Sequence, residues 1–449
     1  MKIPSPSHQV QSHQPDERRR QLLAWAAAGA AGIALPAPAY ARKEKLRTSA
    51  RIVIAGAGAA GLATASRLAA ALDGATITLI DTKVQHWYQP GFTLVGSGVK
   101  PSHYVVSNTA EYVPSSVEWL QQSVAEIDPE GNKVVTSSGK SVPYDFLVVA
   151  TGLTLRYDEI DGMSADLIGR DGIASIYNGP EAAQASWQAL SDFIDRGGRG
   201  LFTRPGTEMK CAGAPLKYTF LAEDHAVRRG QRGNVQIEYF ANNKVLFSVP
   251  IVAEKVRMLF RQRGIPATYE RVLTAIDPGR RVATFRTPEG SEEQPYDFIH
   301  VIPPMRAPEA VRNSPLPWQT GNWAAEGWME VDRATLRHVR YPNVFGVGDI
   351  AGVPKGKTAA SVKWQVPVAV DHLLADIAGT RSEERYEGYT SCPLITRLGR
   401  AMLIEFDYQN NLVYSFPGVI APLEELWVSW VVKTMGLKPT YISMLRGRA

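Results

Sequence analysis

The sequence predicts an α/β protein with two doubly wound domains and a C-terminal helical segment. Three observations predict this fold. A glycine-rich turn at Gly56–Gly61 stands between a predicted strand and a predicted helix. A second strand–turn–helix–strand pattern runs from 199 to 239, and apolar residues recur at helical spacing within Pro422–Leu437. Alternating strands and helices of this kind are typical of Rossmann-like, dinucleotide-binding domains, which are built on parallel sheets.

The first 41 residues have the pattern of an export signal. Arg18–Arg20 precede an apolar, alanine-rich stretch from Leu22 to Leu35, and Ala39–Ala41 offer a small-residue cleavage site. The stretch is short for a membrane span. We expect a twin-arginine signal peptide and a mature protein in the periplasm, peripheral on the membrane. An uncleaved signal anchor is the alternative.

The composition is that of an ordinary globular protein. A chain of 449 residues with 45% hydrophobic and 21% charged residues is long enough for two or three domains. The formal net charge of +5 is modest, and no basic run carries interleaved aromatic residues, so we expect no nucleic-acid partner. We also expect no bound metal. Two cysteines occur, Cys211 and Cys392, and a chain of this size needs no disulfide to fold, so the pair is either incidental or chemical.

The glycine-rich turn has the surroundings that a dinucleotide site requires. A β-branched strand at 51–55 runs into Gly56, Gly58 and Gly61, and a helical pattern follows from Leu62 to Leu72. Gly56 permits the tight turn, Gly58 lets the backbone approach a pyrophosphate, and Gly61 lets the helix pack on the strand. A glycine-rich turn without a ligand is the alternative.

Further residues of this motif complete the predicted site. The start of the helix, at Ala59 and Ala60, offers free N–H groups and the positive end of the helix dipole to phosphates. The next strand, 77–80, ends in Asp81, whose carboxylate suits the adenosine ribose.

Two later strands also end in small or acidic residues, at Thr151-Gly152 and at Gly348-Asp349. Gly348 allows close backbone approach, and Asp349 suits the ribityl chain or the pyrophosphate of a flavin. With the glycine turn, these segments resemble the FAD-binding domain of the two-dinucleotide-binding flavoproteins over about residues 50–385. Capping of the next helix by Asp349 is the alternative.

The second domain lacks the glycine fingerprint. The turn after its first strand, Pro205–Pro215, has lost the spacing, and Cys211 stands where a nicotinamide cofactor would need its phosphates bound. We therefore do not expect NAD(P)H as the electron donor. The resulting division is a signal peptide, an FAD-binding domain in two parts, a second Rossmann-like domain between them, and a C-terminal segment. The signal peptide spans 1–41, the FAD-binding domain spans 42–160 and 300–385, the second Rossmann-like domain spans 161–299, and the C-terminal segment spans 386–449.

The cysteine turn carries a more specific resemblance. Lys210–Lys217 (Lys-Cys-Ala-Gly-Ala-Pro-Leu-Lys) resembles the sulfide:quinone oxidoreductases strongly, and most closely the group that includes the mitochondrial enzymes. Four further segments agree and together span nearly the whole mature chain. These are His86–Thr93, Pro303–Met305, Lys357–Ala360 and Tyr389–Leu394.

The resemblance implies an activity and its partners. The two cysteines would face the flavin and form a disulfide, or a pair bridged by extra sulfur. Sulfide would be the donor, a membrane quinone the electron acceptor, and a thiol or sulfite the sulfur acceptor. No cysteine stands where flavocytochrome c sulfide dehydrogenases tether their flavin, so we expect non-covalent FAD.

The neighbouring residues suggest which cysteine forms the thiolate and which holds the persulfide. Thiolates are favoured near helix N-termini and cations, and Cys211 precedes a predicted helix and is flanked by Lys210 and Lys217. Cys392 has no adjacent cation in the sequence, so we expect it to hold the persulfide after sulfide attacks the Cys211–Cys392 linkage. The alternatives are a structural disulfide and, for Lys217, a solvated helix residue.

Three weaker predictions concern the surroundings of the flavin. The helix that begins near Thr358 should point its N-terminus at the flavin ring, and Lys357 should add positive charge there. An exposed surface lysine is the alternative for Lys357. His86 is a candidate proton shuttle, although its aromatic neighbours favour simple packing equally well.

The tail predicts a membrane-interface helix within Pro422–Leu437. Its apolar face comprises Leu423, Leu426, Trp427, Trp430 and Val431. Mostly opposite lie Glu424, Glu425, Ser429 and Lys433. Quinone resides in the bilayer, so such a helix would give it a short route to the flavin. Docking of the helix on the protein body, or on a second subunit, is the alternative.

Three other functions compete with sulfide:quinone oxidoreductase. A flavocytochrome c type sulfide dehydrogenase would donate to a soluble haem protein, which the tryptophan-bearing tail disfavours. An NADH:quinone reductase is disfavoured by the missing second fingerprint. A flavin-bound redox sensor, whose disulfide gates membrane attachment, would need no turnover.

Overall fold

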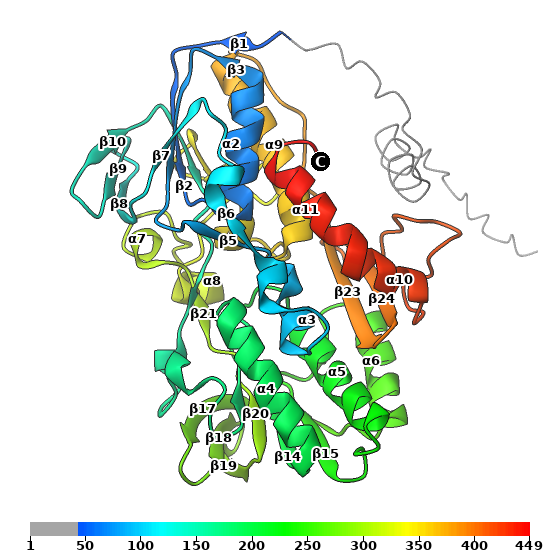
Figure 1. Cartoon of the computed structure of the whole chain (residues 1–449). Coiled ribbons are helices and arrows are strands. Elements are labelled where there is room, and N and C mark those ends of the chain that lie inside the picture. The colour runs from blue at the N-terminus through cyan, green and yellow to red at the C-terminus, as the bar shows by residue number, and fades with distance from the viewer. Residues whose placement is uncertain (1–43) are drawn as a thin grey trace, which may run out of the picture.

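The computed structural model describes residues 44–449, so the predicted signal peptide lies outside the described residues. Two five-stranded parallel sheets form the centres of two domains, which lie one above the other in Figure 1. The first sheet has the order β22-β11-β2-β4-β7. Its strands are β2 Arg51–Ala55, β4 Thr76–Ile80, β7 Val117–Leu120, β11 Phe146–Val149 and β22 Val344–Gly346.

The apolar strands of this sheet are buried on both faces, as parallel sheets require. All residues of β2 after Arg51 are buried. Helices α2 (Ala59–Ala71) and α9 (Ala359–Ile377) pack against each other beside the sheet. Smaller elements complete the domain. They are β1 Leu46–Arg47, β3 Leu72–Asp73, β5 Gln85–Trp87, α3 Phe92–Gly96, β6 Val106–Asn108, β8 Val124–Asp128, β9 Lys133–Thr136, β10 Ser141–Pro143, α7 Glu309–Arg312 and α8 Gly321–Glu326.

The second sheet has the order β13-β20-β14-β15-β16, and a separate antiparallel sheet β17-β18-β19 lies at its end of the molecule. The predicted strand–helix–strand–helix order is confirmed, because parallel strands β14 and β15 alternate with helices α5 and α6. The elements are β13 Ile173–Ala174, α4 Pro180–Arg196, β14 Gly198–Phe202, α5 Ala214–Arg228, β15 Val235–Phe240, α6 Pro250–Gln262, β16 Ala267–Thr268, β17 Val272–Asp277, β18 Val282–Thr287, β19 Gly290–Pro295 and β20 Phe298–His300.

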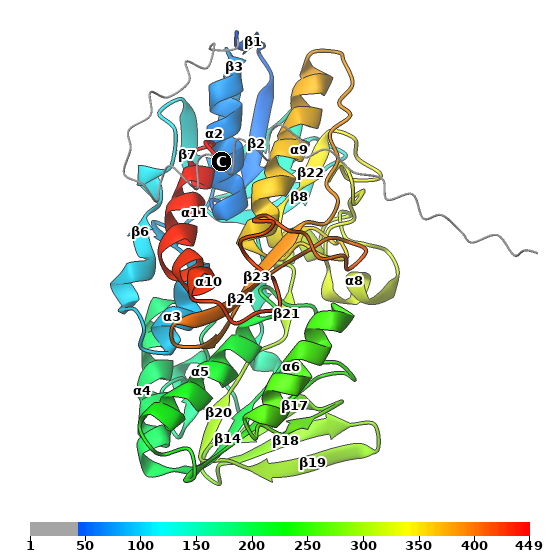
Figure 2. The same cartoon turned by 90° about the vertical axis from the view of Figure 1, so that its right-hand side faces the viewer.

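Two chain crossings join the domains, and a hairpin lies between them. The crossings pair as the antiparallel strands β12 (Thr154–Leu155) and β21 (Met305–Arg306). The hairpin β23 (Thr390–Arg397) and β24 (Arg400–Phe406) lies between the two sheets in Figure 2. It places the end of the chain against both domains.

The tail is not the single helix that the sequence predicts. Helix α10 begins at Trp427, because Leu426 is extended and exchanges backbone hydrogen bonds with Ala401 beside the hairpin. A π-helical turn, Val432–Gly436, separates α10 (Trp427–Val431) from α11 (Leu437–Leu445). Within residues 44–449, no helix has the length and apolar character to cross a membrane.

The two halves of the tail have different surroundings. Helix α11 runs beside α2 in both views, and its Tyr441, Met444 and Leu445 are buried in the core of the first domain. Near α10, by contrast, Trp427 and Met435 are 61% and 67% exposed. Within the predicted segment Pro422–Leu437, one face is docked on the body, with Ser429 and Lys433 buried, while Trp427 and Met435 are exposed.

Candidate active site

The glycine turn has the geometry that its sequence predicts. Gly56 has φ +107°, and a Cβ atom there would lie 2.5 Å from the carbonyl oxygen of Ala150. A Cβ atom on Gly61 would lie 1.8 Å from the carbonyl oxygen of Gly56, so helix and strand approach too closely for a side chain. A Cβ atom on Gly58 would meet nothing within 4 Å. Open space therefore lies at the start of α2.

The start of α2 is electrostatically suited to phosphate. Gly58 is the N-cap and supplies no side chain, and the first turn holds no acidic residue. The first N–H groups of the helix, at Ala59 and Ala60, thus have no capping partner. The Asp81 carboxylate accepts hydrogen bonds from the N–H groups of Ala57 (2.7 Å) and Lys83 (2.9 Å), which holds it beside the turn. This arrangement fits the pyrophosphate and ribose of a dinucleotide.

The other predicted FAD residues lie at the same ends of the first sheet's strands. The buried Thr151 hydroxyl has no hydrogen-bond partner within residues 44–449, and Gly152, with φ +69°, has open space beside it. Gly348 has φ +80° and donates its N–H to Gln365. The Asp349 carboxylate makes no hydrogen bond to the described residues. Its burial raises its pKa, against the opposing effect of nearby lysines.

Lys357 is neither exposed nor free. Only 7% of it is accessible, and its Nζ donates to the carbonyl oxygens of Asp349 (2.6 Å) and Ala351 (3.2 Å). The Nζ also lies 3.6 Å from the ring centroid of Trp328. Burial lowers the pKa of Lys357 to about 8. The alternative of a surface lysine is therefore wrong.

Helix α9 begins where the sequence predicts. Thr358 is its N-cap, and the Thr358 hydroxyl accepts the N–H of Ser361 at 3.1 Å. Because Thr358 caps this helix, the alternative role of Asp349 as the cap is wrong.

The fold brings the two cysteines together from distant parts of the chain. Cys211 lies in the turn between β14 and α5, and Cys392 lies in β23 of the hairpin. A Cβ atom on Gly213, two residues after Cys211, would lie 2.2 Å from Sγ of Cys392. Both cysteines are free thiols in this structure, and Cys392 is buried.

Lys217 lies at the thiol pair. Its Nζ donates to Sγ of Cys211 at 3.4 Å, and only 2% of the residue is accessible. Burial opposes the charge of this ammonium group, but the negative charges of Cys211 and Cys392 raise its pKa above the ordinary value. The alternative of a solvated helix residue is therefore wrong.

A second buried lysine at the pair was missed by the sequence reasoning. Lys433 comes from the π-helical turn of the tail, is 2% accessible, and donates to the carbonyl oxygen of Pro90 at 2.8 Å. Burial and the charge of Lys217 lower its pKa to about 7. The expectation that Lys433 lies on the solvent side of the tail is wrong.

The environment of Cys392 also differs from the sequence prediction. Burial raises the pKa of Cys392, whereas the charges of Lys217 and Lys433 act in the opposite direction. The prediction that Cys392 has no cation beside it is therefore wrong, because sequence neighbours say nothing about cations brought from other elements. The signal that was available is that Lys433 is the single charged residue in the run Trp427–Leu437.

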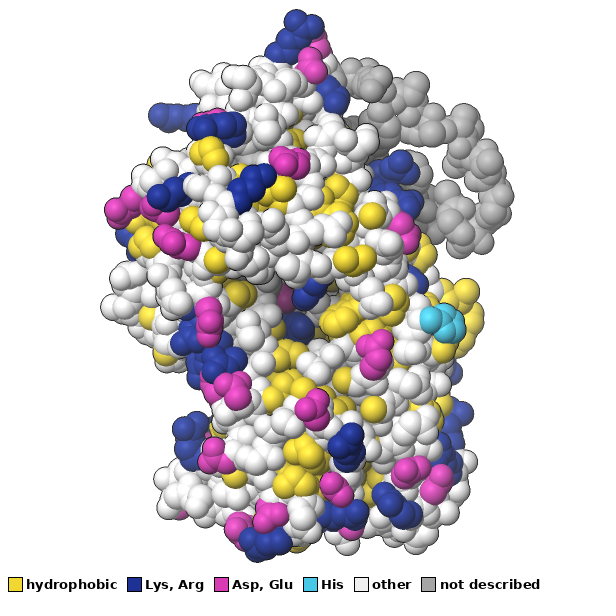
Figure 3. All heavy atoms as spheres, turned by 60° about the vertical axis from the view of Figure 1, so that its left-hand side comes forward, with side chains coloured by type: hydrophobic (Ala, Val, Ile, Leu, Met, Phe, Trp, Pro, Cys, Tyr) yellow, Lys and Arg dark blue, Asp and Glu magenta, His cyan; other side chains and the backbone are white. Residues whose placement is uncertain are grey.

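The thiol pair and the dinucleotide site are physically linked. The N–H of Cys211 donates to the carbonyl oxygen of Lys357 at 2.9 Å. Lys210 donates through Nζ to Gln89 at 2.7 Å, and burial lowers its pKa to about 8. Figure 3 shows a hollow between the two halves of the molecule with charged side chains of both signs inside it.

His86 has the surroundings of a packed residue. It is 5% accessible and its Nε2 lies 2.7 Å from the hydroxyl of Tyr441. Burial lowers the pKa of His86 to about 4, so its ring is neutral at pH 7. Because the ring of His86 is buried and neutral, these surroundings favour a packing role over a role as a proton shuttle.

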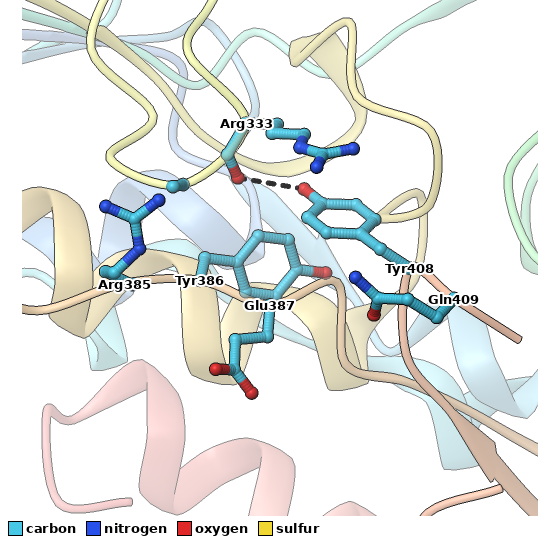
Figure 4. A pocket seen from close by; sticks show the side chains of 7 residues that line it. Arg333, Arg385, Tyr386, Glu387, Tyr408 and Gln409 are labelled. Carbon is cyan, nitrogen blue, oxygen red and sulfur yellow. Dashed lines mark hydrogen bonds between the residues drawn. The ribbon is translucent and has the colours of Figure 1, made fainter. Parts of the chain in front are cut away.

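A separate hollow of about 260 Å³ contains none of the predicted site residues (Figure 4). Two tyrosine rings form its wall, and the guanidinium group of Arg333 lies 5.5 Å from the ring of Tyr408. The lining residues are Arg333, Ala334, Arg385, Tyr386, Glu387, Tyr408 and Gln409.

Comparisons with known proteins agree with this geometry. Residues 50–179 match the pyridine nucleotide-disulphide oxidoreductase family. The solved structure of the sulfide:quinone oxidoreductase from Aquifex aeolicus superposes with a TM-score of 0.72 at 20% identity, covering 89% of this chain and 92% of that one. The mitochondrial sulfide:quinone oxidoreductase of Mus musculus is 34% identical over 369 residues, which are 82% of this chain and 80% of the relative. That of Schizosaccharomyces pombe is 31% identical, covering 82% of each.

The chain belongs to the sulfide:quinone oxidoreductase family. The predicted fold class, a protein of the FAD/NAD(P)-linked disulfide reductase type, is thereby confirmed. Membership makes the chain an FAD-dependent oxidoreductase. The open space at Gly58, the uncapped N–H groups of α2 and the unpartnered Thr151 hydroxyl fit this cofactor.

Proposed function

We propose that this protein oxidises sulfide at the Cys211–Cys392 pair and passes the electrons through FAD to a membrane quinone. The observation that carries the proposal is the meeting of both cysteines at one turn whose backbone is bonded to the dinucleotide-binding domain. FAD, when bound, accepts two electrons for each sulfide and delivers them to the quinone. The chain's own residues set up the sulfur chemistry.

The first step is attack of HS⁻ on the oxidised pair at the sulfur of Cys392. The S–S bond between the cysteines breaks, a new S–S bond forms between Cys392 and the incoming sulfur, and Cys211 leaves as a thiolate. Burial raises the pKa of Cys392, which makes it the poorer leaving group. The ammonium group of Lys217, 3.4 Å from Sγ of Cys211, stabilises the thiolate that leaves.

The pair must then return to its oxidised form. A thiol or sulfite takes the outer sulfur of the persulfide, which frees the Cys392 thiolate. Oxidation of the two thiolates to the disulfide releases the two electrons that enter the flavin. Lys217 and Lys433 balance the negative charge that the pair carries during the cycle.

FAD is held without a covalent bond in this proposal. The chain has two cysteines, of which Cys211 lies in the turn of the second domain and Cys392 lies in β23 of the hairpin. The predicted FAD residues Gly58, Asp81 and Thr151 offer space and hydrogen bonds only. Denaturation of the purified protein should release all of the flavin into the supernatant.

The proposed association with the membrane rests on the exposed part of the tail. Four large apolar side chains of this segment are unusually accessible: Tyr414 at 53%, Val419 at 70%, Trp427 at 61% and Met435 at 67%. Inserted into a lipid interface, each large apolar side chain contributes up to about 1.5–3 kcal/mol, less the cost of ordering. This surface would deliver quinone from the bilayer.

The proposed location is the periplasmic face of the membrane, reached by twin-arginine export. The support is the sequence alone, in Arg18–Arg20 and the apolar stretch that follows. Replacement of Arg18–Arg20 by lysines should retain the protein in the cytoplasm, as measured by fractionation.

The decisive experiment is an anaerobic titration of the purified protein, in the presence of sulfite as the sulfur acceptor, with sulfide and then with quinone, following the flavin absorbance. We expect bleaching with one sulfide per flavin and recovery with one quinone. A flavocytochrome c type enzyme would recover with oxidised cytochrome c instead. A redox sensor would bleach once without catalytic turnover, and absence of bleaching would refute the sulfide proposal.

A paired substitution tests the proposed association with the membrane. Trp427→Glu with Met435→Glu should move the protein from liposomes to the soluble fraction and reduce turnover with long-tailed quinones. The matched control is Val84→Glu with Val339→Glu, which charges two side chains of similar exposure (51% and 53%) outside the tail. Unchanged liposome binding of the tail variant would contradict the proposed membrane association and leave the proposed sulfide chemistry untouched.

A further inference from the structure

We infer that Glu326 is a positioning residue for Cys211, fastening the cysteine turn to the FAD-binding domain so that the two thiols meet in bonding geometry. The inference rests on the proposed role of the cysteine pair. Glu326 belongs to neither predicted motif; it ends α8, a short helix of the other domain. It is 8% accessible, and it makes no salt bridge to a cation within residues 44–449.

The cysteine turn is held from outside its own domain. Both carboxylate oxygens of Glu326 accept the N–H of Glu208, each at 3.1 Å. The N–H of Met305 donates to the hydroxyl of Thr207 at 2.9 Å. The N–H of Cys211 donates to a carbonyl oxygen that also lies in the first domain, that of Lys357. Each contact crosses from the turn to the chain that forms or approaches the FAD site.

Glu326 acts on both ends of this turn. At one end its carboxylate binds Glu208 directly. At the other end it acts through Trp328, whose indole N–H donates to Glu326 at 2.6 Å and whose ring is completely buried. The Lys357 ammonium group lies over that ring, 3.6 Å from the centroid, and the carbonyl of the same lysine receives the Cys211 N–H. Two packed side chains, those of Trp328 and Lys357, thus connect one carboxylate to the backbone that holds the reactive cysteine.

Cys211 needs such support because its backbone is strained. It has φ +51°, a left-handed conformation that costs a residue other than glycine about 1–2 kcal/mol. Such conformations persist where surrounding contacts determine them. A disulfide also requires the two Cβ atoms to lie about 3.5–4.5 Å apart. A turn that relaxes to an ordinary φ would therefore carry the Cys211 thiol away from Cys392.

The prediction is tested by the effective concentration of the two thiols, measured by equilibrating flavin-loaded protein anaerobically in glutathione redox buffers. The oxidised fraction is read by mass spectrometry after alkylation. We expect Glu326→Ala to lower the effective concentration at least tenfold. Glu326→Gln keeps an acceptor oxygen and should stay within threefold of the parent protein. Thr207→Val, which removes another fastening of the same turn, should lower it about threefold.

Glu223→Gln is the matched control. Glu223 is also buried, at 6% accessibility, but it pairs with Arg232 and Arg263 at a site that the cysteine turn does not use. Its variant should leave the effective concentration unchanged. An effective concentration within twofold of the parent in Glu326→Ala would overturn the inference. If Glu326→Ala does not fold, the other two variants decide. An unchanged effective concentration in Thr207→Val, together with a value for Glu326→Gln more than threefold below the parent, would overturn the inference.

The measurement is independent of sulfide and quinone. If the sulfide titration fails while the glutathione equilibrium shifts as expected, the positioning role stands and the proposed substrate is wrong. A second readout separates positioning from general instability. Glu326→Ala should lower kcat for sulfide-dependent quinone reduction while leaving the KM for quinone within twofold, and Glu326→Gln should keep kcat within threefold of the parent.

Discussion

The turns Gly56–Gly61 and Pro205–Gly213 occupy the same position in the two domains, since each joins a parallel strand to the helix that follows it. In the first turn the N-cap is Gly58, and the space beside it is open. In the second turn the N-cap is Gly213, and the corresponding space holds the sulfur of Cys392. One turn leaves room for a phosphate, and the other has a thiol built in.

The difference shows that one fold position can hold negative charge in two ways. The first turn offers uncapped backbone N–H groups and an open approach, which suit a large dianionic ligand. The second turn offers the buried ammonium groups of Lys217 and Lys433, which suit small thiolates formed within the protein. The loss of the glycine fingerprint in the second domain is therefore a change of ligand and leaves the strand–helix framework intact.

The largest expected effect comes from removing the thiols of the second turn. Cys211→Ser and Cys392→Ser should each lower sulfide-dependent quinone reduction at least a hundredfold, about 2.7 kcal/mol of transition-state free energy. Serine cannot form the persulfide or the disulfide. Turnover is measured by quinone absorbance, and flavin content should stay stoichiometric. Activity above a few per cent in either variant would contradict the assigned chemistry.

The next effect separates two glycines within the first turn. Gly58→Leu should fold but purify without flavin, because Gly58 has φ −73° and its new side chain would fill the open space. Gly61→Ala should instead destabilise the protein by about 3 kcal/mol or more, since its Cβ meets a backbone oxygen at 1.8 Å. Flavin absorbance and urea unfolding distinguish the outcomes. A fully loaded Gly58→Leu protein would place the cofactor elsewhere.

A smaller effect concerns the lysine charge at the second turn. The pKa of Lys433 is about 7 when folded against an ordinary value of 10.5, so between these pH values the unfolded chain binds more protons. Stability must then rise with pH across that window, by up to about 1.4 kcal/mol per pH unit from this group. Below pH 7 the cost of burying the charge is fully present. Lys433→Met should therefore gain stability over the parent at pH 7, and lose that gain toward pH 10.

Urea unfolding of both proteins at pH 7, 8 and 9 measures this trend. Lys244→Met serves as the control, because the side chain of Lys244 is 81% exposed. A stability difference between the parent and Lys433→Met that does not change with pH would contradict the burial of a titrating charge.

The sequence was sufficient for features that depend on local geometry. The roles of Gly56 and Gly61 follow from the turn that each must make, and the strand 51–55 and the helix from 214 were predicted within a residue of their observed ends. The meeting of Cys211 and Cys392 came from the family resemblance, because nothing local indicates that the hairpin returns to the second domain.

The sequence was insufficient where contacts with distant elements decide which face of a helix is buried. Helical spacing of 3.6 residues placed Lys433 on the polar face of the tail. In the structure that face packs on the protein, because Ser429 and Lys433, four residues apart, are both buried, whereas Trp427 of the predicted apolar face is exposed. Glu326 and Trp328 were missed because their contacts to the cysteine turn exist only across the domain interface.

The left-handed backbone of Cys211 also bears on how this protein would respond to selection for thermal stability. Glycine adopts φ +51° without the steric cost that cysteine bears. Cys211→Gly should therefore raise the free energy of unfolding by about 1 kcal/mol while eliminating turnover. Thermal melting of the two proteins side by side measures this. A screen for stability alone would discard the residue on which the proposed chemistry depends, so directed evolution of this enzyme must select for activity at every round.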